Sequence, residues 1–136
     1  MSEASTQVAG IVLITVPAIA FGGARLLSFI WGRTPGYLDN PVRQNLWRAG
    51  HAHAGVLVIL ALVGMLLVDH ADLSSTLKTV VRTTLVAAPI LMPLGFFLSV
   101  ASPRSEQPNR LLALVPIGGL SLSIGAVMLG VGLVVA

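Results

Sequence analysis

The stretch Asn45–Asp69, NLWRAGHAHAGVLVILALVGMLLVD, decides how the chain folds. From Val56 to Val68 it is apolar without interruption, which is typical of a helix in the hydrocarbon layer of a membrane. Two histidines, His51 and His53, stand at the entrance to the same helix. Ionisable side chains are rare inside membrane helices and mark functional sites where they occur. The pair is therefore the first candidate for a functional site.

The composition places the whole chain in a membrane. Of its 136 residues, 55% are hydrophobic and 10% are charged, whereas a soluble domain carries about 25% charged residues. This small number of charged residues cannot cover the surface of a soluble globule. We therefore expect an integral membrane protein in contact with the lipid bilayer. The net charge of +3 comes from few residues, and no basic stripe interleaved with aromatics exists, so no nucleic-acid partner is expected. The absence of cysteine excludes disulfides, thiolate ligands and iron–sulfur clusters.

Four segments are long enough to cross a bilayer, which takes about 20 apolar residues in a helix. We expect an all-α fold, a four-helix transmembrane bundle that forms a single domain over residues 1–136. The expected helices cover residues 8–31, 46–68, 77–101 and 111–136. The connections contain Pro35, Pro41, Pro103 and Pro108, which we interpret as breaks between helices. The first segment lacks a basic leader and is long, so we interpret it as a retained helix and not a signal peptide.

Charged and aromatic residues divide unevenly between the two ends of this bundle. Six arginines lie at or near the first and third connections: Arg25, Arg33, Arg43, Arg48, Arg104 and Arg110. We expect Trp31, Tyr37 and Trp47 to form an aromatic belt at the same end. Lys78 and Arg82 lie at the other end, beside two aspartates. The positive-inside rule taken alone would place the arginine-rich end in the cytoplasm.

The spacing of the two histidines points their side chains in nearly opposite directions, because a helix turns by about 100° per residue. One helix therefore does not bring both imidazoles to one ion, unlike the i, i+4 histidines of zinc proteases. The spacing instead favours a helix that stands between two sites, one on each face. Small residues flank the histidines and leave flat space beside the imidazoles: Ala49, Gly50, Ala54 and Gly55.

We interpret the two histidines as ligands of a cofactor. A copper or zinc site would want a third histidine or a carboxylate nearby, and the only acid close in sequence is Asp39. Haem iron needs one or two imidazoles and a flat apolar slot, and its propionates need cations. Haem b therefore explains more of these residues than copper does. The expected cofactor-binding residues are His51, His53, Arg25, Arg43, Arg48, Arg104, Arg110, Gly50, Ala54 and Gly55, with iron on His51 and His53.

Two alternatives stay open at this point. The chain could be a membrane copper- or zinc-binding or transport protein, although no expected span contains Asp or Glu for proton coupling. It could also be a cofactor-free accessory subunit whose histidines only pack or form hydrogen bonds. His70 lies beyond the far end of the same helix, between aspartates, and we interpret it as a solvated loop residue. The sequence has no serine nucleophile paired with a base, no phosphate-binding loop and no pair of catalytic carboxylates. These absences argue against hydrolases and kinases.

The segment RAGHAHAGVL, residues 48–57, resembles the tenth helix of subunit I of the haem–copper oxidases, a family that includes the nitric oxide reductases. There a His-x-His pair in one membrane helix serves two haems, one on each face. That subunit has twelve helices in three pseudo-symmetric sets of four, and the tenth helix is the second of its set. Here too the pair lies near the start of the second of four expected helices. The resemblance covers the whole chain in topology but only about ten positions in residues.

The resemblance implies a one-third unit of that subunit, completed as a homotrimer. It implies haem ligated by His51 of one protomer and His53 of the next, in a bacterial or archaeal cell membrane. The implied roles are electron transfer, with an electron donor or acceptor as partner, or sensing of a small ligand. In the family, arginines after the eleventh helix hold haem propionates, and Arg104 in SPRSEQPNR occupies that place here.

The chain departs from the family in its histidines. The third and fourth expected helices contain none, so the copper-binding histidines have no counterpart and we do not expect a complete oxygen or nitric oxide reductase. The resemblance also reverses the orientation given by charge. In the family, the haem-proximal arginines face outside and the amino terminus is inside, and we adopt that orientation because arginines that hold propionates are not free topology signals.

Overall fold

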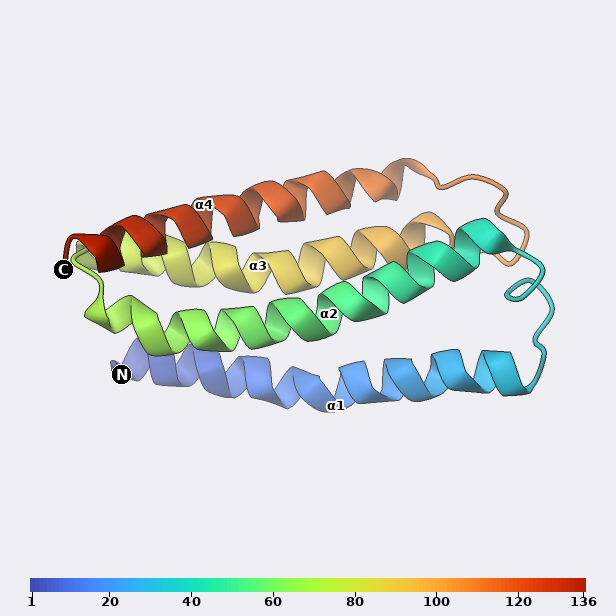
Figure 1. Cartoon of the computed structure of the whole chain (residues 1–136), viewed down its shortest axis with the longest axis horizontal. Helices are drawn as coiled ribbons and strands as arrows, with labels where there is room; N and C mark the ends of the chain where they lie inside the picture. The colour runs from blue at the N-terminus through green and yellow to red at the C-terminus, as the bar shows by residue number, and fades with distance from the viewer.

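The computed structural model describes all 136 residues as four long helices with short connections (Figure 1). Helix α1 spans Glu3–Trp31, α2 spans Pro41–Leu67, α3 spans Ser75–Ser99 and α4 spans Leu114–Val134. Two short 3₁₀ helices, η1 (Val68–His70) and η2 (Arg110–Ala113), extend α2 and precede α4. Each of the four is long and apolar enough to cross a membrane. The expected all-α membrane bundle is confirmed at this level.

Helix α2 begins five residues earlier than expected. The side chain of Asn40 accepts a hydrogen bond from the backbone N–H of Arg43 at 3.0 Å, and Pro41 occupies the first helical position. Proline is favoured there, because its missing N–H would have no partner in the helix. The prediction that Pro41 belongs to the connection is therefore wrong. His51 lies about 15 Å along the helix axis from Pro41, at 1.5 Å per residue.

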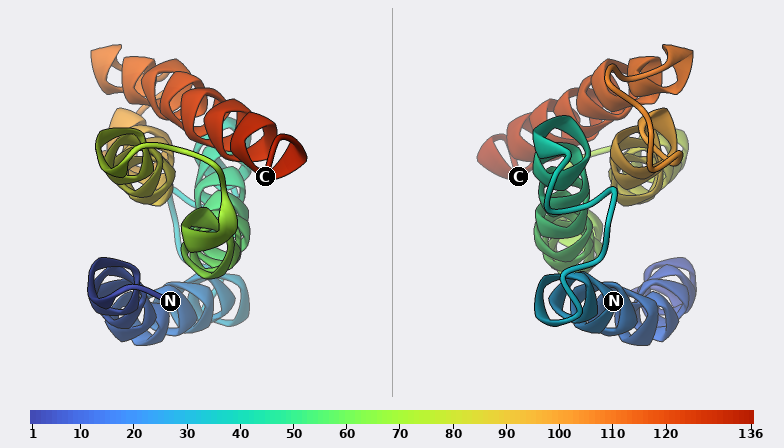
Figure 2. Two further views of the ribbon diagram at one scale, coloured as in Figure 1. Left: turned by 90° about the vertical axis from the view of Figure 1, so that its left-hand side faces the viewer. Right: turned by 90° about the vertical axis from the view of Figure 1, so that its right-hand side faces the viewer.

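The four helices do not form a closed square. Helices α2 and α3 pack together in the centre, α4 packs along α3, and α1 packs mainly against α2. The end-on views show α1 and α4 on opposite sides of the central pair (Figure 2). Because α1 and α3 hardly touch, a lateral groove remains between them.

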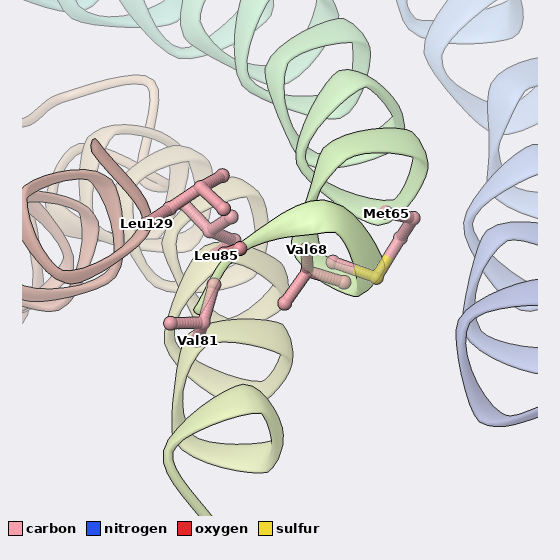
Figure 3. Close-up of a cluster of buried hydrophobic side chains, with 6 residues drawn as sticks. Met65, Val68, Val81, Leu85 and Leu129 are labelled. Atoms are coloured by element: carbon pink, nitrogen blue, oxygen red, sulfur yellow. The ribbon is translucent and has the colours of Figure 1, made fainter. Parts of the chain in front are cut away.

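A cluster of six buried apolar side chains, shown in Figure 3, lies where α2 ends and α3 begins, away from the histidine end of α2. It consists of Met65, Val68, Ala71, Val81, Leu85 and Leu129. These side chains join the end of α2 to the start of α3 and to the last turns of α4. The histidine end of the bundle is therefore held by other contacts.

A polar network ties α1 to α2 and α3 at the same end as the core. Arg82 donates through Nη2 to Asp69 at 2.8 Å and through Nε to the hydroxyl of Ser5 at 2.9 Å. The hydroxyl and backbone N–H of Ser2 also donate to Asp69. With few direct contacts between α1 and α3, these bonds fix the amino-terminal end of α1 against the bundle.

Helix α4 approaches α3 closely through glycines. A Cβ added at Gly118 would lie 2.5 Å from Cγ of Met92 and 3.1 Å from Cβ of Leu91, whereas one added at Gly119 would meet no atom within 4 Å. Small residues allow such close helix packing in membranes.

We therefore predict opposite effects from two neighbouring substitutions. Gly118→Ala should lower the free energy of unfolding by about 1–3 kcal/mol through overpacking. Gly119→Ala should be neutral or raise it by up to about 1 kcal/mol through helix propensity. Reversible unfolding in detergent micelles measures both, and equal effects of the two variants would contradict the α3–α4 packing described here.

Candidate functional site

The two histidine rings face different helices, as the helical spacing predicts. A Cβ added at Gly23 of α1 would lie 3.0 Å from Nε2 of His51, and one added at Gly22 would lie 3.7 Å from its Nδ1. His53 instead packs against Phe96 of α3, with ring centroids 5.0 Å apart and planes inclined by 40°. One helix thus presents one imidazole to α1 and the other to α3.

A backbone bond sets the tautomer of His53. Its Nδ1 lies 2.7 Å from the carbonyl oxygen of Ala49, one turn earlier in the same helix. A carbonyl oxygen only accepts, so Nδ1 carries a proton, and in the neutral imidazole Nε2 keeps a free lone pair. Histidines that bind metals commonly donate the N–H of their second ring nitrogen to a carbonyl in this way. The bond fixes the tautomer and raises the basicity of the ligating nitrogen.

His51 makes no side-chain hydrogen bond within the chain and opens onto two apolar grooves, one on each side of α1. The first groove, of about 280 Å³, lies between α1 and α3 and includes Ala54 and Phe97. The second, of about 390 Å³, includes Gly23 and Gly55. An unpaired imidazole beside apolar walls in a membrane segment is costly, because neither water nor protein satisfies its ring nitrogens.

The small residues of α2 have different uses. Ala54 lines the first groove and Gly55 the second, both beside His51. A Cβ added at Gly55 would meet nothing within 4 Å, so open space adjoins it. Gly50 is buried, and the space beside it is filled by Phe96 and Phe97 at 3.0 and 3.1 Å from an added Cβ. Gly50 therefore provides close packing with α3 and no slot beside an imidazole.

Arg43 is occupied by the protein. It is buried and donates to the backbone carbonyls of Gly36, Val100 and Ala101 at 2.9, 3.2 and 3.2 Å. Its guanidinium also lies 4.1 Å above the ring of Trp47. The last carbonyls of a helix lack partners within the helix. Arg43 donates hydrogen bonds to the carbonyls at the end of α3. This bonding explains Arg43 without a cofactor.

Arg25 and Arg48 lie near His51 and are exposed. Arg25 follows Gly22 by three residues and Ala18 by seven, which places it on the α1 face that lines the first groove. Arg48 precedes His51 by three residues and Gly55 by seven, on the α2 face that lines the second groove. Each groove thus has one arginine about a turn closer to the arginine-rich end.

The remaining expected arginines lie farther along the same end. Arg104 is exposed and lines a polar hollow between the first and third connections with Asp39 and Glu106. Arg110 is exposed in η2. The single ion pair of the chain is Arg82–Asp69 at the opposite end, so none of the expected propionate-binding arginines is paired with a carboxylate.

An aromatic cluster closes the arginine-rich end above His51. The ring of Trp47 lies 5.5 Å from Phe29, 6.2 Å from Tyr37 and 6.1 Å from Phe97, centroid to centroid. Tyr37 lies at the expected end but is completely buried in this cluster, whereas Trp31 is 77% exposed. The cluster joins four separate segments, and no periodic signal in the sequence could reveal it. The glycine pair facing His51 was missed for the same reason.

Comparison of the chain with protein-family models, with curated proteins and with solved structures finds no match.

The contact between His51 and α1 generates a prediction. Gly23→Val should displace the His51 ring and lower the free energy of unfolding by about 1–3 kcal/mol through overpacking. Gly10→Val is the matched control, because a Cβ at Gly10 of the same helix would meet nothing within 4 Å.

Unfolding in detergent and the ¹⁵N resonances of the His51 ring report the two effects. Unchanged His51 resonances in Gly23→Val would show that the ring does not rest on α1.

Proposed function

We propose that the protein binds haem b through His51 and His53 and transfers electrons in the membrane. The observation that carries this proposal is the divergent pair of imidazoles on one membrane helix. One ring has its Nδ1 tied to a backbone carbonyl, which leaves Nε2 free for a metal. The other ring opens onto apolar grooves without a hydrogen-bond partner.

The residues fit haem better than a bare metal ion. Zinc and copper sites use sets of three or more His, Cys, Asp or Glu ligands, and no such set lies close together within one chain. Haem iron takes one or two axial imidazoles and otherwise needs apolar surroundings. Arg25 and Arg48 are exposed cations without carboxylate partners, and each suits a propionate beside one groove. Arg43 and Gly50 are left out of this assignment because other contacts explain them.

The divergence of the rings supports ligation between copies of the chain. One helix cannot direct both imidazoles to one iron, so two ligands for one haem must come from two protomers. We place His51 of one protomer and His53 of the next around each haem, in a homotrimer. A closed ring permits such head-to-tail contacts.

Each residue then has a distinct part. Haem held by His51 and His53 would supply one-electron chemistry. The Ala49 carbonyl holds the His53 tautomer, and Phe96 packs against its ring. The apolar grooves beside His51 exclude water, while Arg25 and Arg48 balance the charge of the propionates.

Single substitutions test the ligand assignment. His51→Ala and His53→Ala should each lower the haem content per protomer severely, because each removes an axial ligand of every haem in the ring. His70→Ala is the control, since His70 is exposed at the far end of α2. Pyridine-haemochrome assay of the purified proteins measures haem content, and full haem content in both variants would refute the proposal.

Mixed oligomers test ligation between protomers. Co-expression of the His51→Ala and His53→Ala chains should restore part of the haem, since random assortment leaves about one interface in four with both ligands. Differently tagged chains allow the mixed assemblies to be isolated and their size to be measured by native mass spectrometry. Absence of rescue in isolated mixed trimers would contradict ligation across the interface.

A further inference from the structure

The lateral groove between α1 and α3 widens away from His51. Its wide part, of about 450 Å³, shares Ile11, Val86 and Ile90 with the first groove beside His51. Its other walls are Val8 of α1 and Ala87 of α3. The walls are mostly apolar, and the groove opens sideways because α1 and α3 hardly touch. A molecule dissolved in the bilayer could therefore enter without leaving the membrane.

Arg82 lines the wide part of this groove and has donors to spare. Its Nε and Nη2 donate to Ser5, Ser2 and Asp69, while Nη1 has no partner in the chain. Only 11% of the side chain is exposed, and its charge is balanced by Asp69 at 2.8 Å. The network fixes the guanidinium, so it cannot extend freely to the lipid headgroups. Arg82 lines an apolar groove and Nη1 is its unused donor, and an N–H donor beside apolar walls calls for an acceptor oxygen.

Two threonines add acceptors at the same place. Thr79 and Thr83 also line the groove, and each donates its hydroxyl proton to a backbone carbonyl one turn earlier, at 3.0 Å. Their oxygens keep lone pairs that accept hydrogen bonds. The groove thus offers a fixed donor and two acceptors at one end of an apolar channel.

We propose that this groove binds a membrane-soluble quinone, with one carbonyl oxygen on Nη1 of Arg82 and the isoprenoid tail leaving sideways into lipid. A neutral carbonyl fits better than a phosphate, because Asp69 already neutralises the arginine. In the reduced form, a hydroquinone O–H donates to the oxygen of Thr79 or Thr83. This site uses none of the haem-binding residues, so it stands or falls independently of the proposed function.

Filling the groove tests the proposal while leaving the Arg82 network intact. Ala87→Phe places a ring in the wide part, whereas Val127→Phe adds the same ring on the exposed face of α4 and serves as the control. Decylubiquinone binding to the full-length protein in phosphatidylcholine nanodiscs is measured by equilibrium dialysis against empty nanodiscs. The parent protein and Val127→Phe should bind saturably, and Ala87→Phe about tenfold more weakly because the ring fills the space.

Three results would overturn the proposal. Uptake equal to that of empty nanodiscs would show only partition into lipid. Saturable binding unchanged in Ala87→Phe would place the quinone elsewhere. Displacement of decylubiquinone by phosphatidylglycerol at equimolar amounts, checked by native mass spectrometry of the retained lipid, would assign the groove to a phospholipid.

Discussion

The structure depends on one constraint: in a bilayer, polar groups must find their partners inside the protein or in a bound molecule. Most of the backbone groups are satisfied inside the four helices, which contain 91 of the 105 backbone hydrogen bonds. At the two ends of the bundle, Arg43 donates hydrogen bonds to the carbonyls that follow α3, and Arg82 joins α1 to Asp69. The groups that remain without partners are then informative. They include the ring of His51 and Nη1 of Arg82, whose residues line grooves, the Nε2 of His53, and the buried hydroxyl of Tyr37 and Nε1 of Trp47.

The spans could be predicted from the sequence because hydropathy and length report directly on the bilayer. Their starts could not, since the bonds of Asn40 and Ser2 that begin α2 and α1 compete with the apolar pattern for the helix boundary. The hydropathy pattern also does not predict which helices pack against one another. Which glycine packs against a neighbour and which faces open space, as with Gly118 and Gly119, is decided by tertiary contacts.

The candidate site divides in the same way. Helical geometry alone predicts the opposite directions of His51 and His53, and the structure confirms them with α1 and α3 as the respective neighbours. The bond that selects the His53 tautomer could have been suspected from the i−4 position of Ala49, but it depends on the side-chain rotamer. Arg43 carried the same signal as its exposed neighbours, and only its burial against the end of α3 separates it from them.

The most direct test of the central claim is the visible absorption spectrum of the purified, unmodified protein, oxidised and then reduced with dithionite. Ligation by His51 and His53 predicts a sharp Soret band and, after reduction, the narrow α and β bands of six-coordinate haem with two imidazole ligands. A colourless protein from cells supplied with ample haem would contradict it. Elemental analysis for copper and zinc would then decide whether the two imidazoles hold a metal ion at all.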